Sequence, residues 1–343
     1  MISALKELTV ELTQKCFQSC LYCSSNSSVN DDIKLSFEIV KQVLNDLSSL
    51  GGEVVELSGG EPLSYERIYE TIEYASQKGF EVHLFTCAYL PNAQIDFTGL
   101  NRVDKFYVNL QAPNKIIHDY LANNPGSFDR AISFIKKCKA AGKWVGTHLV
   151  PLAPNVDEID EYLELAKLLK LDNVSLLRFV QQGRGRKNTL ALNDDEILQL
   201  LSTIEKHREV DTLDFKIGCP MDFGFVYKKG RTAIQCKSGI SRCVIRPNGN
   251  VIPCPAFKDS TEFVAGNVND RSLVNIWKKS DIFEQFRNFD HRRLSGLCSN
   301  CSFLGICKGR CPAQRWHYYG NLYQGPDPYC PLKLVKTHKN ISY

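Results

Sequence analysis

Long hydrophobic runs are absent from this sequence. No stretch of about 18 apolar residues, the length that a membrane-spanning helix needs, occurs among its 343 residues. The first segment, MISALKELTVEL, is interrupted by Lys6, Glu7 and Glu11, so it lacks the apolar core of a signal peptide. We therefore expect a cytoplasmic protein with no membrane partner.

The sequence also lacks a strong charge of either sign. Its 42 basic and 38 acidic residues give a formal net charge of +4, which is too small to indicate a nucleic-acid partner. A hydrophobic fraction of 43% and a charged fraction of 23% exclude a disordered chain. No internal repeat and no low-complexity linker occurs in it.

Cysteine, by contrast, is abundant, with 14 residues. A chain of this length buries a core that needs no disulfide bonds, and the cytoplasm keeps thiols reduced. Clustered cysteines in such a protein usually bind metal. The sequence therefore predicts metal centres rather than a disulfide scaffold.

The first half of the chain alternates between strand and helix patterns. The six expected strands lie at about residues 8–13, 54–57, 81–85, 105–110, 144–150 and 174–180, with apolar residues at helical spacing between them. Repeated strand–helix units form a parallel sheet whose active site lies at the carboxyl ends of the strands. The expected fold class is α/β, and six units fit a partial (β/α)6 TIM-like barrel better than a closed eightfold one.

The second half has a different composition. Regular alternation fades after a helix at about residues 194–207, and cysteine, glycine and proline become frequent from about residue 231. We expect a barrel in residues 1–190, a bridging helical segment in 191–230 and a small cysteine-rich domain in 231–343.

Three cysteines, Cys16, Cys20 and Cys23, follow the first strand directly. Three protein ligands leave one coordination position open, which is typical of a catalytic metal centre, and all-sulfur ligation suits an iron–sulfur cluster. A zinc site is the structural alternative.

Cys-x3-Cys-x2-Cys with an aromatic residue before the last cysteine resembles the radical S-adenosylmethionine (SAM) enzymes. The segment Leu57-Ser58-Gly59-Gly60-Glu61-Pro62 is similar to the Gly-Gly-Glu-Pro segment of that family at the end of the second strand. Gly59 and Gly60 let the backbone approach a ligand closely, and the carboxylate of Glu61 can receive an ammonium group. By resemblance, this is the ammonium group of SAM.

The resemblance implies both cofactors and chemistry. The cysteines would hold a 4Fe–4S cluster whose open iron binds SAM, and an external reductant such as flavodoxin or ferredoxin would supply electrons. Reductive cleavage of SAM would give a 5′-deoxyadenosyl radical that abstracts hydrogen from the substrate. A barrel that excludes water protects such a species.

Other contacts with SAM are implied by position. Tyr22 matches the aromatic residue beside the adenine, although plain packing of the loop explains it equally well. Asn109 lies at the end of the fourth strand and would face the ribose or carboxylate of SAM. Arg178, which we place inside the sixth strand, would supply a charge for the carboxylate, or would instead form a structural ion pair.

Eight further cysteines form an ordered array near the C-terminus. Its spacings resemble the SPASM extension of radical SAM enzymes, which carries two auxiliary 4Fe–4S clusters; four-cysteine zinc sites are the structural alternative. The ligation of that family implies one cluster on Cys236, Cys243, Cys254 and Cys311. It implies the other on Cys298, Cys301, Cys307 and Cys330. Both would be fully ligated and would transfer electrons.

The remaining residues carry weaker indications. Cys87 and Cys138 are explained as buried small hydrophobes, and Cys219 lies near the expected domain junction. His148 on the fifth strand is either a proton donor or a core histidine. A basic loop at 182–188 is expected to be solvated.

The SPASM extension in known relatives accompanies modification of peptides or proteins. We therefore expect a radical SAM oxidoreductase or maturase whose substrate is a peptide or protein side chain, which it oxidises or crosslinks. Pro255 after Cys254 counts against formylglycine chemistry, because sulfatase maturases have an aspartate there. The alternatives are an enzyme that acts on a small molecule or cofactor precursor and a non-catalytic electron carrier.

Overall fold

A single sheet organises the chain. The computed structural model describes residues 4–91, 94–187, 189–207, 213–217, 221–228 and 235–337. Within these residues the strand order is β10-β9-β8-β1-β2-β3-β4-β5-β6-β7. Strands β1 to β8 run parallel to one another, whereas β9 pairs in antiparallel with both β8 and β10. The parallel strands are β1 (Glu7–Thr13), β2 (Val54–Gly59), β3 (Glu81–Thr86), β4 (Lys105–Val108), β5 (Trp144–Leu149), β6 (Asn173–Leu176), β7 (Asp214–Ile217) and β8 (Arg242–Ile245), and the antiparallel pair is β9 (Asn250–Ile252) and β10 (Gly266–Asn267).

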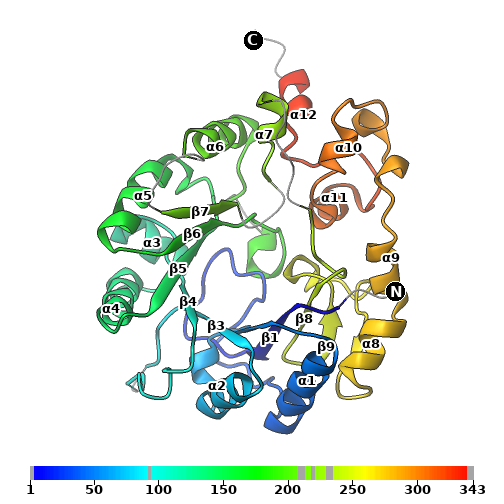
Figure 1. Cartoon of the computed structure of the whole chain (residues 1–343). Coiled ribbons are helices and arrows are strands. Elements are labelled where there is room, and N and C mark those ends of the chain that lie inside the picture. Colours follow the sequence, from blue (N-terminus) through cyan, green and yellow to red (C-terminus); the bar gives the residue numbers. More distant parts are fainter. Residues whose placement is uncertain are drawn as a thin grey trace.

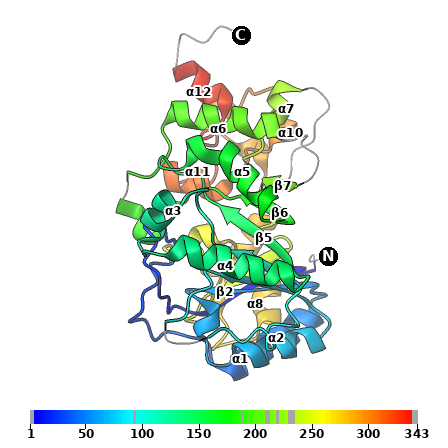
Figure 2. The same cartoon turned by 90° about the vertical axis from the view of Figure 1, so that its left-hand side faces the viewer.

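Six helices lie along the outer side of the curved sheet (Figure 1). They are α1 (Phe37–Ser49), α2 (Ile68–Gln77), α3 (Lys115–Ala122), α4 (Ser127–Ala140), α5 (Ile159–Leu168) and α6 (Asp194–His207). The C-terminal third adds short helices beside β8 and β9, on the side where the ring of strands is open. These are α8 (Leu273–Lys279), α9 (Asp281–Arg287), α10 (Leu304–Cys307) and α11 (Pro312–Tyr319), while α7 (Gly224–Tyr227) and α12 (Pro331–Thr337) lie near α6. A view from the side shows α1 and α2 at one end of the molecule and α6 and α12 at the other (Figure 2).

Alternation along β1 produces two buried faces. Leu8, Val10 and Leu12 are fully buried in the core that also takes in the apolar face of α1. The intervening side chains are polar and buried on the other face, where the Thr9 hydroxyl donates to the Glu56 carboxylate at 2.5 Å. Side chains of successive strand residues point to opposite faces. The polar face therefore lines the inside of the barrel.

The expected partial barrel is confirmed, and the structure adds two strands to it. β7 extends the parallel sheet beyond β6, and β8 pairs in parallel with β1 at the other edge. Since β7 and β8 are not neighbours, the described sheet remains open. The sixth strand is shorter than expected, because β6 ends at Leu176. Arg178 thus lies in the loop beyond the strand, not inside it.

None of the helices in the described part of the chain is long and apolar enough to cross a membrane.

Candidate active site and auxiliary cysteine sites

The first cysteine loop is fixed by backbone hydrogen bonds to its surroundings. Gln14 N–H donates to Ile33 O at 2.8 Å, and Cys16 N–H donates to Ser28 O at 3.0 Å. Within the loop, Cys23 N–H donates to Cys20 O at 3.1 Å. The loop therefore starts at the carboxyl end of β1, where a parallel sheet places its functional groups.

Cys16, Cys20 and Cys23 lie on one loop, within electrostatic reach of one another. Burial raises the pKa of the Cys20 thiol far above its usual value, and the neighbouring Cys23 and Cys16 add to the rise. Three thiols that influence one another in this way cannot all ionise unless a cation balances them. Bound iron would supply that charge, so the donor set fits an iron–sulfur cluster.

Gly59 and Gly60 allow β2 to approach the cysteine loop. A Cβ on Gly60 would lie 2.2 Å from Lys15 O and 2.5 Å from Gln14 O. Gly59 has a φ of +139°, and its Cβ would lie 2.4 Å from Thr13 O. The close approach that we expected toward a ligand is made here toward the backbone leading to Cys16.

The Glu61 carboxylate is fully buried and already accepts three hydrogen bonds. Its Oε1 accepts from Leu63 N–H at 3.0 Å and from the Thr86 hydroxyl at 2.7 Å, and its Oε2 accepts from Cys87 N–H at 2.8 Å. Burial raises the pKa of Glu61, while these hydrogen bonds oppose the rise. A carboxylate has about four acceptor positions, and the Cys87 side chain is a fourth partner of Glu61. The contact of Glu61 with the ammonium group of SAM therefore stays a prediction.

Cys87, which we had explained as a buried small hydrophobe, lies between two predicted site residues. Its thiol is hydrogen-bonded with Cys16 and with Glu61. The hydrogen bond with Cys87 lowers the pKa of Cys16, and the same bond together with burial raises the pKa of Cys87. Nothing in the sequence pattern indicated this contact, since the two cysteines follow different strands.

Tyr22 and Asn109, assigned to SAM by resemblance, contact each other. The Tyr22 hydroxyl donates to Asn109 Oδ1 at 2.8 Å, and the same oxygen accepts from Gln111 Nε2 at 2.8 Å. Gln111 also makes two hydrogen bonds to the end of β5. Its Nε2 donates to His148 O at 2.8 Å, and its Oε1 accepts from Val150 N–H at 3.0 Å. The pair thus stands at the carboxyl ends of β4 and β5.

The basic loop after β6 contacts the cysteine loop. It contains a 3-10 helix, η3 (Gly183–Lys187). Arg184 Nε donates to Cys20 O at 3.0 Å, its Nη1 donates to Ser27 O at 2.7 Å, and its N–H donates to Cys23 O at 3.0 Å. Our expectation of a solvated loop is therefore wrong for Arg184, although Arg186 is exposed. Asn188 lies outside the described residues.

Thiols of one C-terminal cysteine set influence one another electrostatically. Burial raises the pKa of Cys298 to about 11, with Cys307 and Cys301 among the causes. Burial likewise raises the pKa of Cys330 to about 12, with Cys307 contributing. Cys298, Cys301, Cys307 and Cys330 therefore share one region, and their thiols fit a four-cysteine cluster.

The other set is brought together only in part. Burial raises the pKa of Cys311; Arg178 opposes the rise, and Asp327, Cys236 and Cys254 add to it. Cys243 is fully buried in β8, where it is paired with Leu8 of β1. Burial also raises the pKa of Cys243, and Arg287 opposes that rise.

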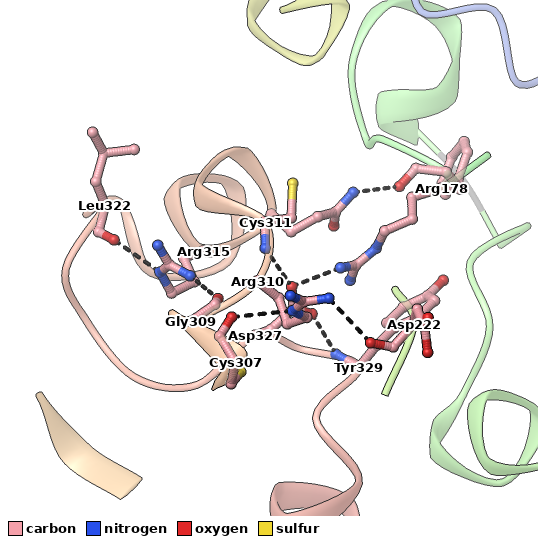
Figure 3. A network of polar contacts seen from close by, with 12 residues as sticks. Arg178, Asp222, Cys307, Gly309, Arg310, Cys311, Arg315, Leu322, Asp327 and Tyr329 are labelled. Atoms are coloured by element: carbon pink, nitrogen blue, oxygen red, sulfur yellow. Dashed lines mark hydrogen bonds and ion pairs between the residues drawn. The ribbon is translucent and has the colours of Figure 1, made fainter. Parts of the chain in front are cut away.

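A buried polar network connects these cysteines with the barrel (Figure 3). Arg178 Nη1 donates to Asp327 Oδ2 at 2.7 Å, and both side chains are 1% exposed. Asp327 Oδ2 also accepts from Cys311 N–H at 3.0 Å, and its Oδ1 accepts from Tyr329 N–H at 2.9 Å. Of the two alternatives for Arg178, the structure displays the ion pair, and its contact with SAM stays a prediction.

Two further arginines lie close to the second cysteine set. Arg310 donates to Cys307 O and to Asp222 O, each at 3.1 Å. Arg315 is fully buried, donates to Leu322 O at 2.8 Å and contacts Gly309 O, while its Nη2 lacks a hydrogen-bond partner in the described region. A buried guanidinium group with an unsatisfied donor, such as that of Arg315, favours an anionic group beside it.

His148 and Cys138, two of the remaining residues from the sequence analysis, lie on β5 and α4 of the barrel. His148 stacks against Tyr107 and Phe85, with ring centroids 4.5 and 5.0 Å apart. Burial lowers its pKa to about 3, so the ring is neutral near pH 7 and holds no proton to donate as an imidazolium. Cys138 is fully buried on α4, as expected for a small hydrophobe. Cys219 lies outside the described residues.

Comparison with known families agrees with this geometry. A model described as the radical SAM superfamily matches residues 10–169, and one described as an iron–sulfur cluster-binding SPASM domain matches residues 236–302. The chain carries a radical SAM domain and a SPASM domain. It is a radical SAM enzyme, and its cofactors are SAM, one catalytic 4Fe–4S cluster and auxiliary iron–sulfur clusters.

Several curated proteins are similar along nearly the whole chain. Mycofactocin maturase MftC of Mycobacterium tuberculosis is 28% identical, over 94% of this chain and 82% of its own length. PqqA peptide cyclase of Rhizobium meliloti is 26% identical, over 94% and 86%. An AdoMet-dependent heme synthase of Methanosarcina barkeri is 25% identical, over 96% and 97%.

The fold of this radical SAM enzyme is also that of a solved structure. Streptococcus suis SuiB bound to its precursor peptide SuiA superposes with a TM-score of 0.78 at 18% identity, over 96% of this chain and 76% of that one. The likeness confirms the α/β barrel followed by a C-terminal SPASM domain.

Proposed function

We propose that this enzyme cleaves SAM reductively and uses the resulting 5′-deoxyadenosyl radical to modify a peptide or protein side chain by oxidation or crosslinking. The observation that supports the proposal is the electrostatic interaction of the Cys16, Cys20 and Cys23 thiols on one loop, with the buried Glu61 acting on Cys16. A 4Fe–4S cluster with an open iron would supply the electron that cleaves SAM.

The chain's own residues bind and orient SAM. Cys16, Cys20 and Cys23 would leave one iron without a protein ligand, and the Glu61 carboxylate is the assigned contact for the ammonium group. Tyr22 and Asn109 are the assigned contacts for the adenine and for the ribose or carboxylate. The buried polar face of the barrel keeps bulk water away from these groups.

The auxiliary cysteines are proposed to carry electrons. The set of Cys298, Cys301, Cys307 and Cys330 would hold one cluster, and Cys236, Cys254 and Cys311 would contribute to the other. We assign residues 1–190 to the radical SAM barrel, 191–230 to the bridging segment and 231–343 to the SPASM domain. An external reductant such as flavodoxin or ferredoxin would supply electrons, and no nucleic acid or membrane takes part.

A peptide is the preferred substrate class because the relative PqqA peptide cyclase acts, by its name, on a peptide and aligns with 94% of this chain. The heme synthase relative has nearly the same length as this chain, which makes a cofactor precursor the second candidate.

The first experiment tests the radical chemistry. The protein is purified without oxygen, reconstituted and incubated with SAM and dithionite. We expect about twelve irons per chain and formation of 5′-deoxyadenosine, which must disappear when Cys16, Cys20 and Cys23 are changed together to Ala. Production of 5′-deoxyadenosine by that triple variant would contradict the mechanism.

The second experiment separates the two substrate classes. Small peptides encoded beside the gene are incubated with the enzyme and SAM, and mass spectrometry follows the loss of hydrogen from the peptide. Modification of a peptide supports the proposal. Turnover of a porphyrin precursor, with every peptide unchanged, would support the second candidate instead.

A further inference from the structure

Cys243 packs in a different hydrophobic core from Cys254 and Cys311, two other cysteines of its expected set. It is 0% exposed and lies in the main hydrophobic core together with Leu8, Trp277 and Phe283. Cys254 and Cys311 instead pack against a separate core that contains Phe257.

Strand register explains this separation. Cys243 stands opposite Leu8 of β1, whose side chain faces the outer helices, and side chains at equivalent positions of paired strands share a face. The Cys243 side chain therefore points toward α8 and α9, where Arg287 lies over the Trp277 ring at 4.3 Å. Burial raises the pKa of the Cys243 thiol, and the Arg287 guanidinium group opposes the rise.

Turning Cys243 toward the other three would carry a high cost. A rotated or shifted β8 would break its register with β1 and expose the apolar side chains that now fill the core, since a slip of one residue exchanges the two faces of a strand. By contrast, Cys236, Cys254 and Cys311 lie in loops or at helix ends, where they adapt to a cluster without disturbing the sheet.

We propose that Cys243 is a core residue and that the first auxiliary cluster is held by three thiolates, Cys236, Cys254 and Cys311, which leaves one iron open to an exogenous anionic ligand such as a thiolate. The inference rests on the cluster ligands assigned under the proposed function. It replaces the four-cysteine set expected for this cluster and the conclusion that the cluster is fully ligated.

Arg178 makes an anionic ligand the favoured class. Its guanidinium group lies within electrostatic reach of Cys311, and Nη1 alone is taken up by Asp327. Nε and Nη2 are buried without a hydrogen-bond partner in the described part of the chain, and the ring of Tyr329 covers one face at 4.0 Å. Unsatisfied buried donors of a cation attract an anion.

Iron content tests the role of Cys243. Cys243→Val keeps an apolar side chain in the core, so the variant should retain about twelve irons per chain. Cys254→Ala removes a ligand from the same cluster and should lose about one third of the iron. Loss of one third of the iron in Cys243→Val, with circular dichroism unchanged, would overturn the proposal.

The open iron is tested without disturbing the auxiliary domain. The variant with Cys16, Cys20 and Cys23 changed to Ala lacks the catalytic cluster, so any ligand binding is auxiliary. After reduction with dithionite, ¹³C-cyanide should produce a ¹³C hyperfine coupling in the electron–nuclear double resonance spectrum. Absence of that coupling would contradict the open iron. Loss of iron on changing Cys219 to Ala would also contradict it, because Cys219 would then be a cluster ligand.

The outcomes separate the two proposals. If the wild-type protein binds only about four irons, the auxiliary cluster assignment of the proposed function fails. If it binds about twelve and Cys243→Val binds about eight, the assignment stands and only the inference about Cys243 fails.

Discussion

Two consecutive glycines hold the end of β2 against the backbone that leads into the first cysteine loop. Gly60 has an ordinary φ, so space alone excludes a side chain there: its Cβ would lie 2.2 Å from Lys15 O. Gly60 N–H also donates to Thr13 O at 2.7 Å, and Glu61 N–H donates to Lys15 O at 2.7 Å. The position of Cys16 therefore depends on the absence of a Cβ atom at Gly60.

Gly60→Ala should displace this backbone and weaken the catalytic cluster. We expect the reconstituted variant to bind about eight irons instead of about twelve and to lose about 1–3 kcal/mol of stability through overpacking. Iron analysis and electron paramagnetic resonance measure the change. Gly305→Ala is the control, since nothing lies within 4 Å of its Cβ; equal iron in both variants would contradict the role of Gly60.

His118 should make stability depend on pH. Burial lowers its pKa to about 4 from 6.5, and its Nδ1 accepts Gln111 N–H at 3.1 Å inside the protein. The unfolded chain binds the proton first as pH falls, so the stabilisation is complete above pH 6.5 and is lost toward pH 4. Between pH 7.5 and 5.5 this amounts to about 1.3 kcal/mol.

His118→Asn keeps an acceptor near Gln111 N–H but does not titrate. The decrease in melting temperature from pH 7.5 to 5.5 should be smaller in this variant than in the wild type by about 2 °C, measured by anaerobic calorimetry. His291→Asn, in a surface 3-10 turn, serves as the control. Parallel pH profiles for His118→Asn and the wild type would rule out the effect.

At the scale of elements, hydrophobic periodicity was enough to predict most of the barrel. Strands β1 to β6 and the helices between them could be predicted because apolar alternation and helical spacing depend on neighbouring residues. The structure shows the same for α6, which begins and ends as expected at Asp194 and His207. The pairing of β8 with β1 depends on residues more than 200 positions apart and leaves no local pattern.

In the candidate site, too, local patterns could be predicted from the sequence and contacts between distant segments could not. The spacing of Cys16, Cys20 and Cys23 is local, so it could be read from the sequence. The contact of Cys87 with Cys16 joins two loops that follow different strands. Arg184 was missed for the same reason, since charge in a glycine-containing loop resembles a solvated surface. Cys243 was assigned to an auxiliary cluster by its spacing, and spacing does not show to which face of a strand a side chain points.

The loop after β6 should stabilise the first cysteine loop. Arg184 donates hydrogen bonds from its side chain to Cys20 O and Ser27 O. Hydrogen bonds from a charged group contribute about 1.5–3 kcal/mol, so Arg184→Ala should release iron from the catalytic cluster to a chelator about tenfold faster or more. Arg186→Ala, whose side chain is 64% exposed, is the matched control. Equal release rates in the two variants would contradict this role.

At the scale of the whole molecule, the barrel and the SPASM domain are not separable units. β8 belongs to the C-terminal part of the chain, yet it extends the barrel sheet beside β1. The buried pair of Arg178 and Asp327 makes a second connection, and Asp327 also accepts Cys311 N–H and Tyr329 N–H. The backbone at Cys311, a proposed cluster ligand, is thereby fixed relative to the barrel.

Breaking the Arg178–Asp327 pair should therefore destabilise both parts together. Arg178→Met leaves Asp327 buried without its counter-charge, and loss of one partner of such a pair costs about 3–5 kcal/mol. Asp327→Asn should have a similar effect. The double variant Arg178→Met with Asp327→Asn should lose less stability than the sum of the two single variants, because neither charge is left unpaired.

Anaerobic denaturant unfolding gives these free energies, and cluster absorbance should disappear in the same transition as the far-ultraviolet circular dichroism. Lys115→Ala, from an exposed pair with Asp129, should leave the transition unchanged. Additive losses, or cluster absorbance that disappears well before the barrel unfolds, would show that the pair does not couple the two domains.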